Sequence, residues 1–399
     1  MPRLSALLST LMLLLAACTG DAPHADTDAP LGPCAARPLS SAVAFDTAPL
    51  FRAGDDGYAV YRIPSVLTLR DGSLLAFAEA RPSLADAGSG LIDLVTKRSD
   101  DCGATWSALQ VIQENGAGDV TNPTAVIVPD GAGGERIALF FDRWPEGVGE
   151  GNVPAGTGPD SESIELMWSD DDGATWSAPR DLTADVKQND WKIASVGPGR
   201  AIVTAWGNPD APVGRIVVPG WQTSDTEGGS FTFTSDDGGE TFTRAVGTQP
   251  GTNESQVIEL TDGSLALDGR QNSALASPTR QVYTSTDGAQ TWSAPRPGLT
   301  MTTIMSSTLR LGAERDGDAA DLLVHSGVAP TAREDLRVWQ SADEGQTWTN
   351  ERVLREGFTQ YSVLTRLDDG TVGVVFESLA GGDQGPGYSI EFGRLAIDE

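Results

Sequence analysis

The stretch Ser99-Asp-Asp-Cys-Gly-Ala-Thr-Trp106 decides the fold of this chain, because four further versions of the same eight residues follow it. The versions begin at positions 99, 169, 235, 285 and 341; Phe242 replaces the final Trp in one, and Ala289 replaces Gly in another. Ser and Asp side chains close tight turns by bonding nearby backbone amides, Gly permits an unusual backbone conformation, and the aromatic residue buries a large surface. A repeat of this kind indicates stacked or radial units.

The spacing of the repeats and the strands around them indicate a β-propeller. Successive repeats start 70, 66, 50 and 56 residues apart. A blade of four strands needs roughly 40–50 residues, and longer active-site loops account for the rest. Short aromatic and β-branched strands are predicted just before three of the turns, at 165–168, 281–284 and 336–339. No stretch has a long helical period.

The ends of the chain complete the predicted ring. Strand-like segments at 65–69 and 74–77 precede the first repeat, and segments at 363–365, 372–376 and 390–392 follow the last one without a repeat of their own. One blade for each repeat plus this unmarked blade gives six. We therefore predict an all-β fold, a six-bladed β-propeller over residues 43–399, closed by pairing of the N- and C-terminal strands.

Composition excludes several classes of function. The chain has 399 residues and a formal net charge of −29, so nucleic acid and anionic membrane surfaces are poor partners. An anionic ligand would be repelled by this surface unless arginines were clustered at its site. His24 and His325 are the only histidines, which leaves little material for a His-based zinc site or a Ser-His-Asp triad.

The N-terminal segment predicts export. An apolar run at 4–17 follows Arg3, and residues 1–17 are expected to be a signal peptide of the lipoprotein type. Leu15-Ala-Ala-Cys18 resembles a bacterial lipobox, which makes Cys18 the expected lipidation site; an ordinary secretory signal with a chance Cys is the alternative. Residues 18–42 are expected to be a flexible tether. The protein would then be an outer-membrane or cell-surface lipoprotein, or otherwise secreted. Pairing of Cys34 with Cys102 stays open.

Six motifs outside the repeats carry the information about function. In chain order they are Tyr61-Arg62-Ile63-Pro64, Arg81-Pro-Ser-Leu-Ala-Asp86, Asn253-Glu254-Ser255 with Arg270 placed 16 residues after Glu254, Arg333, Tyr361-Ser362 and Phe376-Glu377. Any single motif would be weak, but the ordered set with its spacings is specific. Together with the repeats, which are known as Asp boxes or BNR repeats, it resembles the bacterial exo-α-sialidase (neuraminidase) family over nearly all of the mature chain.

The resemblance implies that Arg62, Arg270 and Arg333 bind the carboxylate of a sialic acid. Planar guanidinium groups hold carboxylates with charge-assisted, often bidentate bonds. The resemblance also gives Arg81 a contact with a substrate hydroxyl, and it makes Glu377 the partner that orients Arg62. On residue type alone, any one of these arginines could instead be a surface residue in an ion pair.

The resemblance also implies the catalytic residues. Most retaining glycosidases attack with a carboxylate, and sialidases with a Tyr nucleophile are an exception. By resemblance Tyr361 is the nucleophile, Glu254 is its base, and Asp86 is the acid that protonates the leaving oxygen and then activates water. From residue type alone, Tyr361 could be a strand aromatic packed in a blade, and the two acids could be solvated.

The sequence thus resembles that of a retaining exo-α-sialidase, which hydrolyses terminal sialic acid from glycoconjugates. The alternatives are a trans-sialidase, a hydrolase of a related nonulosonic acid such as the deaminated form, and a non-catalytic sialoglycan-binding propeller. Retention of Tyr361, Glu254 and Asp86 argues against the binding module, because binding needs only the arginines. We expect no cofactor, no metal, and a monomer that binds sialylated glycans, glycoproteins or glycolipids and touches a membrane only through its lipid anchor.

Overall fold

The computed structural model describes residues 32–35, 39, 45–88, 90–272, 279–379 and 387–397 of the unit Gly32–Glu399. The expected signal peptide and Cys18 lie outside the described residues, as does most of the expected tether. Within the described ranges, no helix is long and apolar enough to cross a membrane.

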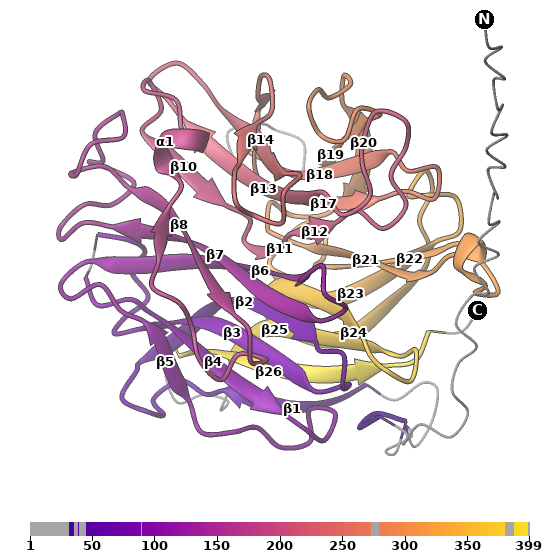
Figure 1. Ribbon diagram of the computed structural model, residues 1–399. Coiled ribbons are helices and arrows are strands. Elements are labelled where there is room, and N and C mark those ends of the chain that lie inside the picture. The colour runs from indigo at the N-terminus through magenta and orange to yellow at the C-terminus, as the bar shows by residue number, and fades with distance from the viewer. Residues whose placement is uncertain are drawn as a thin grey trace, which may run out of the picture. The chain divides into compact units, whose positions relative to one another are not determined.

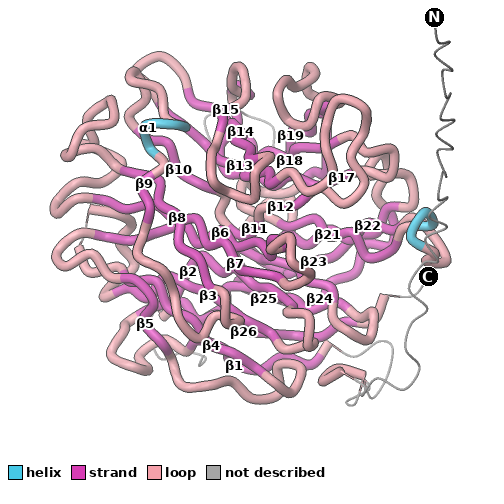
Figure 2. Tube along the Cα trace, viewed as in Figure 1, coloured by secondary structure: helices cyan, strands magenta, loops and turns pink. Residues whose placement is uncertain are grey.

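Short strands joined by turns make up nearly all of the described structure, which confirms the all-β prediction (Figure 2). The strands pair into five sheets. One sheet contains β2 (Val60–Thr68), β3 (Leu74–Arg81), β4 (Asp93–Ser99) and β5 (Gln110–Gln113). A second sheet contains β11 (Gly199–Arg200), β6 (Asp119–Pro129), β7 (Glu135–Trp144), β8 (Ser163–Ser169) and β9 (Arg180–Asp181). A third sheet contains β10 (Ile193–Val196), β12 (Ile202–Val203), β13 (Ile216–Thr223), β14 (Gly228–Ser235), β15 (Thr243–Arg244) and β16 (Gln249–Pro250). A fourth contains β17 (Thr252–Glu259), β18 (Leu265–Gln271), β19 (Thr279–Ser285) and β20 (Arg296–Thr300).

The fifth sheet has seven strands and is built around one long strand. Its strands are β21 (Ser307–Gly312), β22 (Leu322–Gly327), β23 (Glu334–Ser341), β24 (Thr349–Arg366), β25 (Val372–Leu379), β26 (Tyr388–Leu395) and β1 (Asp46–Phe51). The first part of β24 pairs with β23, and from Thr359 onward the strand pairs with β25. The described pairings thus give five sheets, or six units when β24 is counted in two of them. Helical structure is confined to α1 (Thr183–Val186) and η1 (Glu314–Asp316) in the described part of the chain.

The sheets form a β-propeller whose ring closes through the two ends of the unit. Strand β1 pairs antiparallel with β26, from Asp46 opposite Arg394 to Phe51 opposite Ile390, and the two strands run side by side in Figure 1. This confirms the predicted closure by N- and C-terminal strands. A closed sheet arrangement leaves no long free strand edges, which would otherwise invite pairing with other chains.

Each repeat forms the turn between the third and fourth strands of its unit. Its Ser is the last residue of β4, β8, β14, β19 or β23. In the first repeat the Ser99 hydroxyl donates to Asp101 and accepts from the Gly103 amide, while the Asp101 carboxylate accepts from both the amide and the hydroxyl of Thr105. The same contacts recur in the other four repeats, so the turn satisfies its own polar groups as the sequence predicted.

The aromatic residue of the repeat connects neighbouring sheets. Trp106 lies 5.6 Å from the ring of Phe392 in β26, and Trp176 lies 5.8 Å from Phe77 in β3, both edge to face. Each therefore packs on the sheet that precedes its own in the ring. Gly103 allows this close approach, because its φ is +76° and a Cβ there would lie 2.1 Å from the Phe392 ring. The repeat thus fixes both a turn and the spacing between blades.

A disulfide joins Cys34 to Cys102, across 68 residues. Both cysteines are fully buried, and the backbone amide of Cys34 also donates to the Asp368 carboxylate. The sequence had left this pairing open. Because Cys34 falls within the stretch expected to be a tether, that stretch is held covalently to the first repeat at this point.

Candidate active site

A cleft of about 390 Å³ collects seven of the predicted site residues from strands far apart in the chain. They are Arg62, Arg81, Asp86, Glu254, Arg270, Arg333 and Tyr361. The eighth, Glu377, is fully buried beside Arg62. A larger hollow of about 560 Å³ near Asn115, Arg143 and Glu165 contains none of them.

Four strands that line the cleft break their pairing register at the functional residue. The breaks fall between Arg62 and Ser65 in β2, Thr121 and Thr124 in β6, Thr252 and Ser255 in β17, and Thr359 and Ser362 in β24. An extra residue in one strand of a pair bends that strand and re-aims its side chains, and such bulges are common beside active sites. The bulges present Arg62, Glu254 and Tyr361 to the cleft.

Two residues at these bulges have left-handed backbone conformations. Ile63 has φ +56° and Asn122 has φ +57°, and for a β-branched residue such as Ile this conformation is rare and strained. The Ile63 amide donates to Glu377 Oε1 at 2.7 Å, and the Asn122 amide donates to Glu79 Oε1 at 2.7 Å. A buried carboxylate therefore holds each strained segment in place.

Tyr361, Glu254 and Arg270 form a hydrogen-bonded triad. The Tyr361 phenol donates to Glu254 Oε1 at 2.5 Å, and Arg270 Nη1 donates both to the phenol oxygen, at 2.8 Å, and to Glu254 Oε2. Burial raises the pKa of the Tyr361 phenol; the Arg270 charge opposes this rise and the Glu254 charge adds to it. The phenol is therefore neutral at physiological pH and has a base in position to accept its proton.

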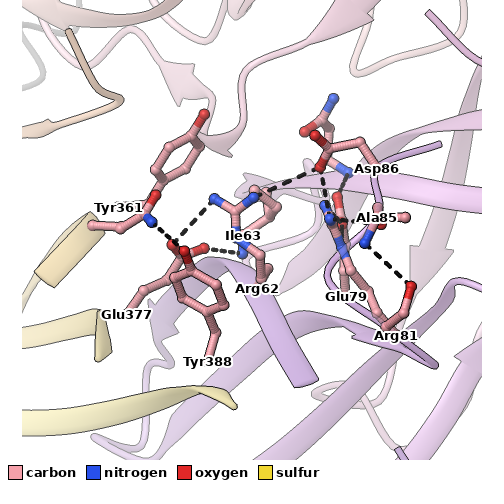
Figure 3. Close-up of polar contacts among 12 residues, drawn as sticks. Arg62, Ile63, Glu79, Arg81, Ala85, Asp86, Tyr361, Glu377 and Tyr388 are labelled. Carbon is pink, nitrogen blue, oxygen red and sulfur yellow. Dashed lines mark hydrogen bonds and ion pairs between the residues drawn. The ribbon is translucent and has the colours of Figure 1, made fainter. Parts of the chain in front are cut away.

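Arg62 is held by a carboxylate and two aromatic rings (Figure 3). Its Nη2 donates to Glu377 Oε2 at 3.2 Å, and its Nη1 lies 3.6 Å from Asp86 Oδ1. Its Cζ lies 5.3 Å from the ring centroid of Tyr361 and 5.4 Å from that of Tyr388. Glu377 thus forms an ion pair with Arg62.

Arg81 connects Asp86 to the protein interior (Figure 3). Its Nη1 donates to Asp86 Oδ1 at 2.7 Å and to the Ala85 carbonyl at 3.1 Å, and its Nε donates to the buried Glu79 at 2.7 Å. The cleft partly desolvates the Asp86 carboxyl, although its side chain is 64% exposed, and this alone would raise its pKa; Arg81, with smaller contributions from Arg62 and Arg333, holds the pKa below its ordinary value. Asp86 is therefore ionised in the free protein at neutral pH.

Arg333 immediately precedes β23, and two acceptors orient its guanidinium. Its Nη1 donates to Gln360 Oε1 at 2.7 Å, and its Nη2 donates to the Thr303 carbonyl at 3.1 Å. Arg62, Arg270 and Arg333 thus reach the same cleft from β2, β18 and the segment before β23. The three guanidinium groups place positive charge at one cleft, which the carboxyl groups of Glu79, Asp86, Glu150 and Glu254 also line.

The sequence had not singled out several residues of the cleft. Asn122 lines it from the β6 bulge, and Trp144 and Trp221 form an apolar part of its wall. A signal for Asn122 existed: Asn122-Pro-Thr124 parallels Ile63-Pro-Ser65, and both segments form bulges. Glu150, an exposed residue, also lines the cleft, where partial desolvation together with the charges of Asp86 and Glu254 raises its pKa. Nothing in its Gly-rich surroundings marked Glu150.

The described residues offer little to a metal ion. Within the described ranges, the one group of His, Cys, Asp and Glu side chains with ligand-like spacing is Cys34, Asp368 and Asp369. The Cys34 sulfur is part of the disulfide, so a thiolate ligand is not available there. None of the three residues lines the cleft.

Comparisons with known proteins agree with this arrangement. A family model described as "BNR repeat-like domain" matches residues 66–374. The sialidase of Micromonospora viridifaciens is 30% identical over 86% of this chain and 52% of its own length, and the sialidase of Bacteroides fragilis is 28% identical over 82% of this chain and 61% of its own length. This chain thus spans about half to three fifths of these two relatives.

Solved structures show the same fold. The structure titled "Hadza microbial sialidase Hz136" superposes with a TM-score of 0.75 at 29% identity and covers 88% of this chain and 68% of that one. An intramolecular trans-sialidase from Ruminococcus gnavus superposes with a TM-score of 0.71 at 20% identity, over 87% of this chain and 96% of that one. The chain belongs to the sialidase family with BNR repeats.

Proposed function

We propose that this protein is a retaining exo-α-sialidase that hydrolyses terminal sialic acid from glycoconjugates through a Tyr nucleophile. The observation that carries the proposal is the 2.5 Å hydrogen bond from the Tyr361 phenol to Glu254, inside a cleft that also holds three arginines. The family membership and the sialidase relatives support the same activity.

The arginines and the neutral phenol suit a substrate that carries a carboxylate on its anomeric carbon. In the proposed complex Arg62, Arg270 and Arg333 bind that carboxylate through charge-assisted hydrogen bonds. A carboxylate nucleophile would be repelled by it, whereas a neutral phenol avoids this repulsion and gains nucleophilicity as its proton leaves. Burial keeps the Tyr361 phenol neutral until Glu254 takes the proton.

The reaction proceeds in two balanced steps. In the first, the Tyr361 oxygen bonds to the anomeric carbon, Glu254 takes the phenol proton, and Asp86 gives a proton to the departing glycosidic oxygen. In the second, Asp86 takes a proton from water, the water oxygen bonds to the anomeric carbon, and Tyr361 leaves and regains its proton from Glu254. Two displacements at one carbon give net retention.

Asp86 needs a proton before it can act as the acid. In the free protein the positive charges of Arg81, Arg62 and Arg333 hold its pKa low. A bound substrate carboxylate would neutralise part of the Arg62 and Arg333 charge, which removes part of that cause and raises the pKa of Asp86. Substrate binding thus prepares Asp86 for proton donation.

Hydrolysis of an aryl α-sialoside, followed by proton NMR, tests this proposal. We expect release of the phenol and the α-anomer of the free sugar as the first product, with Tyr361→Phe strongly impaired. Initial release of the β-anomer would contradict the mechanism. Sialoside binding without turnover would favour a non-catalytic glycan-binding propeller. A preference for the deaminated nonulosonic acid, or a sialylated acceptor as product, would change the substrate or reaction type but leave Tyr361 as nucleophile.

We also propose that the protein is exported, lipidated at Cys18 and monomeric. The disulfide between Cys34 and Cys102 supports export, because disulfides persist in oxidising compartments. Incorporation of labelled fatty acid, absent from a Cys18→Ala variant, would test the anchor. Unlabelled protein in the culture medium would indicate ordinary secretion.

A further inference from the structure

We propose that Gln360 and Tyr388 form a strut that holds two of the arginines, Arg62 and Arg333, in a fixed relation to each other. The inference rests on the proposed function, in which both arginines bind one substrate carboxylate. It makes Gln360 and Tyr388 positioning residues, because they act on the ligand through the arginines.

Hydrogen bonds at both ends of the Gln360 amide define the strut. Its Oε1 accepts from Arg333 Nη1 at 2.7 Å, and its Nε2 donates to the Tyr388 phenol oxygen at 2.9 Å. A guanidinium can only donate, so the amide must turn its oxygen to Arg333 and its nitrogen to Tyr388. Gln360 is only 6% exposed, so water competes little for these bonds.

The Tyr388 ring completes the connection to Arg62. Its centroid lies 5.4 Å from the Arg62 Cζ, within the range of a cation–π contact, and Phe358 packs against its ring at 5.2 Å. Figure 3 shows Tyr388 close to Arg62 and Glu377. Glu377 already accepts a hydrogen bond from one side of the Arg62 guanidinium, so the Tyr388 ring restricts the movement of the guanidinium that this bond still allows.

The strut also adjoins the nucleophile. Gln360 immediately precedes Tyr361, and both lie inside the register break between Thr359 and Ser362. A regular strand would direct two successive side chains to opposite faces. At this bulge one of them contacts Arg333 and the other contacts Glu254, so the strut sets the arginine spacing relative to the attacking oxygen.

This arrangement predicts a specific loss of carboxylate affinity when the strut is broken. Tyr388→Phe removes the phenol but keeps the ring over Arg62, and Gln360→Leu removes both hydrogen bonds. Tyr388→Phe, which loses one neutral hydrogen bond, should weaken binding of an unsaturated sialic acid analogue by about 2- to 10-fold. Gln360→Leu also loses the charge-assisted bond from Arg333 and should weaken binding at least as much. Because both act through one connection, the double variant should lose less than the product of the two single effects.

The test compares two ligands by calorimetry: the unsaturated analogue, and the same analogue with its carboxylate converted to a neutral amide. Strut variants should lose affinity for the first ligand and keep that for the second. Tyr58→Phe is the matched control, because it removes a phenol–carboxylate hydrogen bond to Asp93 at a residue that does not line the cleft. It should leave both affinities unchanged, and thermal unfolding checks that all variants are folded.

Three outcomes would overturn the strut. They are unchanged affinity of both strut variants, equal losses for the two ligands, and independent effects in the double variant. Failure of the proposed function looks different: wild-type protein would bind the analogue and its neutral amide equally well, or would bind neither. Carboxylate-dependent binding by a wild type that turns nothing over would still test the strut, because the calorimetric comparison needs no catalysis.

Discussion

Glu254 accepts a 2.5 Å hydrogen bond from the Tyr361 phenol, although 107 positions separate the two residues in the chain. Glu254 lies in β17 and Tyr361 in β24, which belong to different sheets. Each residue sits at a bulge of its own strand. The pair therefore depends on the closed ring of sheets for its distance and on two local register breaks for its direction.

Glu254→Gln should reduce turnover by about 10²- to 10⁴-fold, the usual contribution of a positioned base. The amide keeps the shape of the side chain, but it cannot take the Tyr361 proton. The loss should appear in kcat for an aryl sialoside with little change in unfolding temperature. Turnover within a factor of three of wild type would show that another group accepts the proton.

Asp86→Asn should distinguish between leaving groups. Loss of the acid should slow release of a sugar leaving group by about 10²- to 10⁴-fold, while an acidic phenol, which departs without a proton, should be released nearly as fast as by wild type. Equal losses for the two leaving groups would assign Asp86 another role.

The pH dependence of kcat/KM of the wild-type protein should show the titration of Asp86. Because the charge of Arg81 helps to hold the pKa of Asp86 below its ordinary value, the protonated acid is scarce in the free enzyme at neutral pH. The value of kcat/KM for sugar leaving groups should therefore fall as pH rises above this low pKa, and this limb of the profile should be missing in Asp86→Asn. An identical limb in the variant would contradict the assignment.

Asp237→Asn should destabilise the fold in a pH-dependent way. The side-chain hydrogen bond from Thr241 is the main cause that lowers the pKa of Asp237 to about 2. The ionised carboxylate then contributes stability that is complete above the ordinary Asp pKa and is lost as pH falls toward 2. The urea midpoints of wild type and variant should differ at pH 7 and converge near pH 2. Asp160→Asn, at an exposed loop position, is the control; a constant difference at all pH values would contradict this origin.

Removal of the disulfide should lower the free energy of unfolding by about 2–4 kcal/mol, because the crosslink closes a long loop in the unfolded chain. The double variant Cys34→Ala/Cys102→Ala should unfold at lower urea than wild type, and a reductant should shift only the wild type. Two free thiols in native wild-type protein would show that the bond does not form.

The sequence was informative about the frame because the repeat carries its own local chemistry. The Ser, Asp and Thr side chains and the Gly backbone amide satisfy each other within eight residues, as at Ser99 to Thr105, so the turns and their order could be predicted. The number of sheets was harder to predict. Strand β24 runs on from one unit into the next, and no local signal marks a strand shared in this way.

The site was predictable only where its motifs had a known counterpart. Arg62, Glu254 and Tyr361 belong to such motifs, whereas Gln360 and Glu150 matter through contacts that the fold creates over long sequence distances. Gln360 donates a hydrogen bond to Tyr388, which lies 28 residues later in the chain, and partial desolvation together with the charges of Asp86 and Glu254 raises the pKa of Glu150. Neither relation leaves a periodic or compositional mark. The segments Arg62-Ile-Pro-Ser65 and Asn253-Glu-Ser255 can be read in the sequence, but only the register of the paired strands shows that they form bulges and direct side chains into the cleft.

Covalent trapping tests most directly the proposal that Tyr361 is the nucleophile. A 2,3-difluorinated sialic acid forms the glycosyl-enzyme quickly and releases it slowly, because the fluorine at carbon 3 destabilises the transition state of hydrolysis. After peptide digestion and mass spectrometry, we expect the adduct on Tyr361, and no adduct in Tyr361→Phe. An adduct on Glu254 or Asp86, or continued turnover by Tyr361→Phe at the wild-type rate, would contradict the proposal that Tyr361 is the nucleophile.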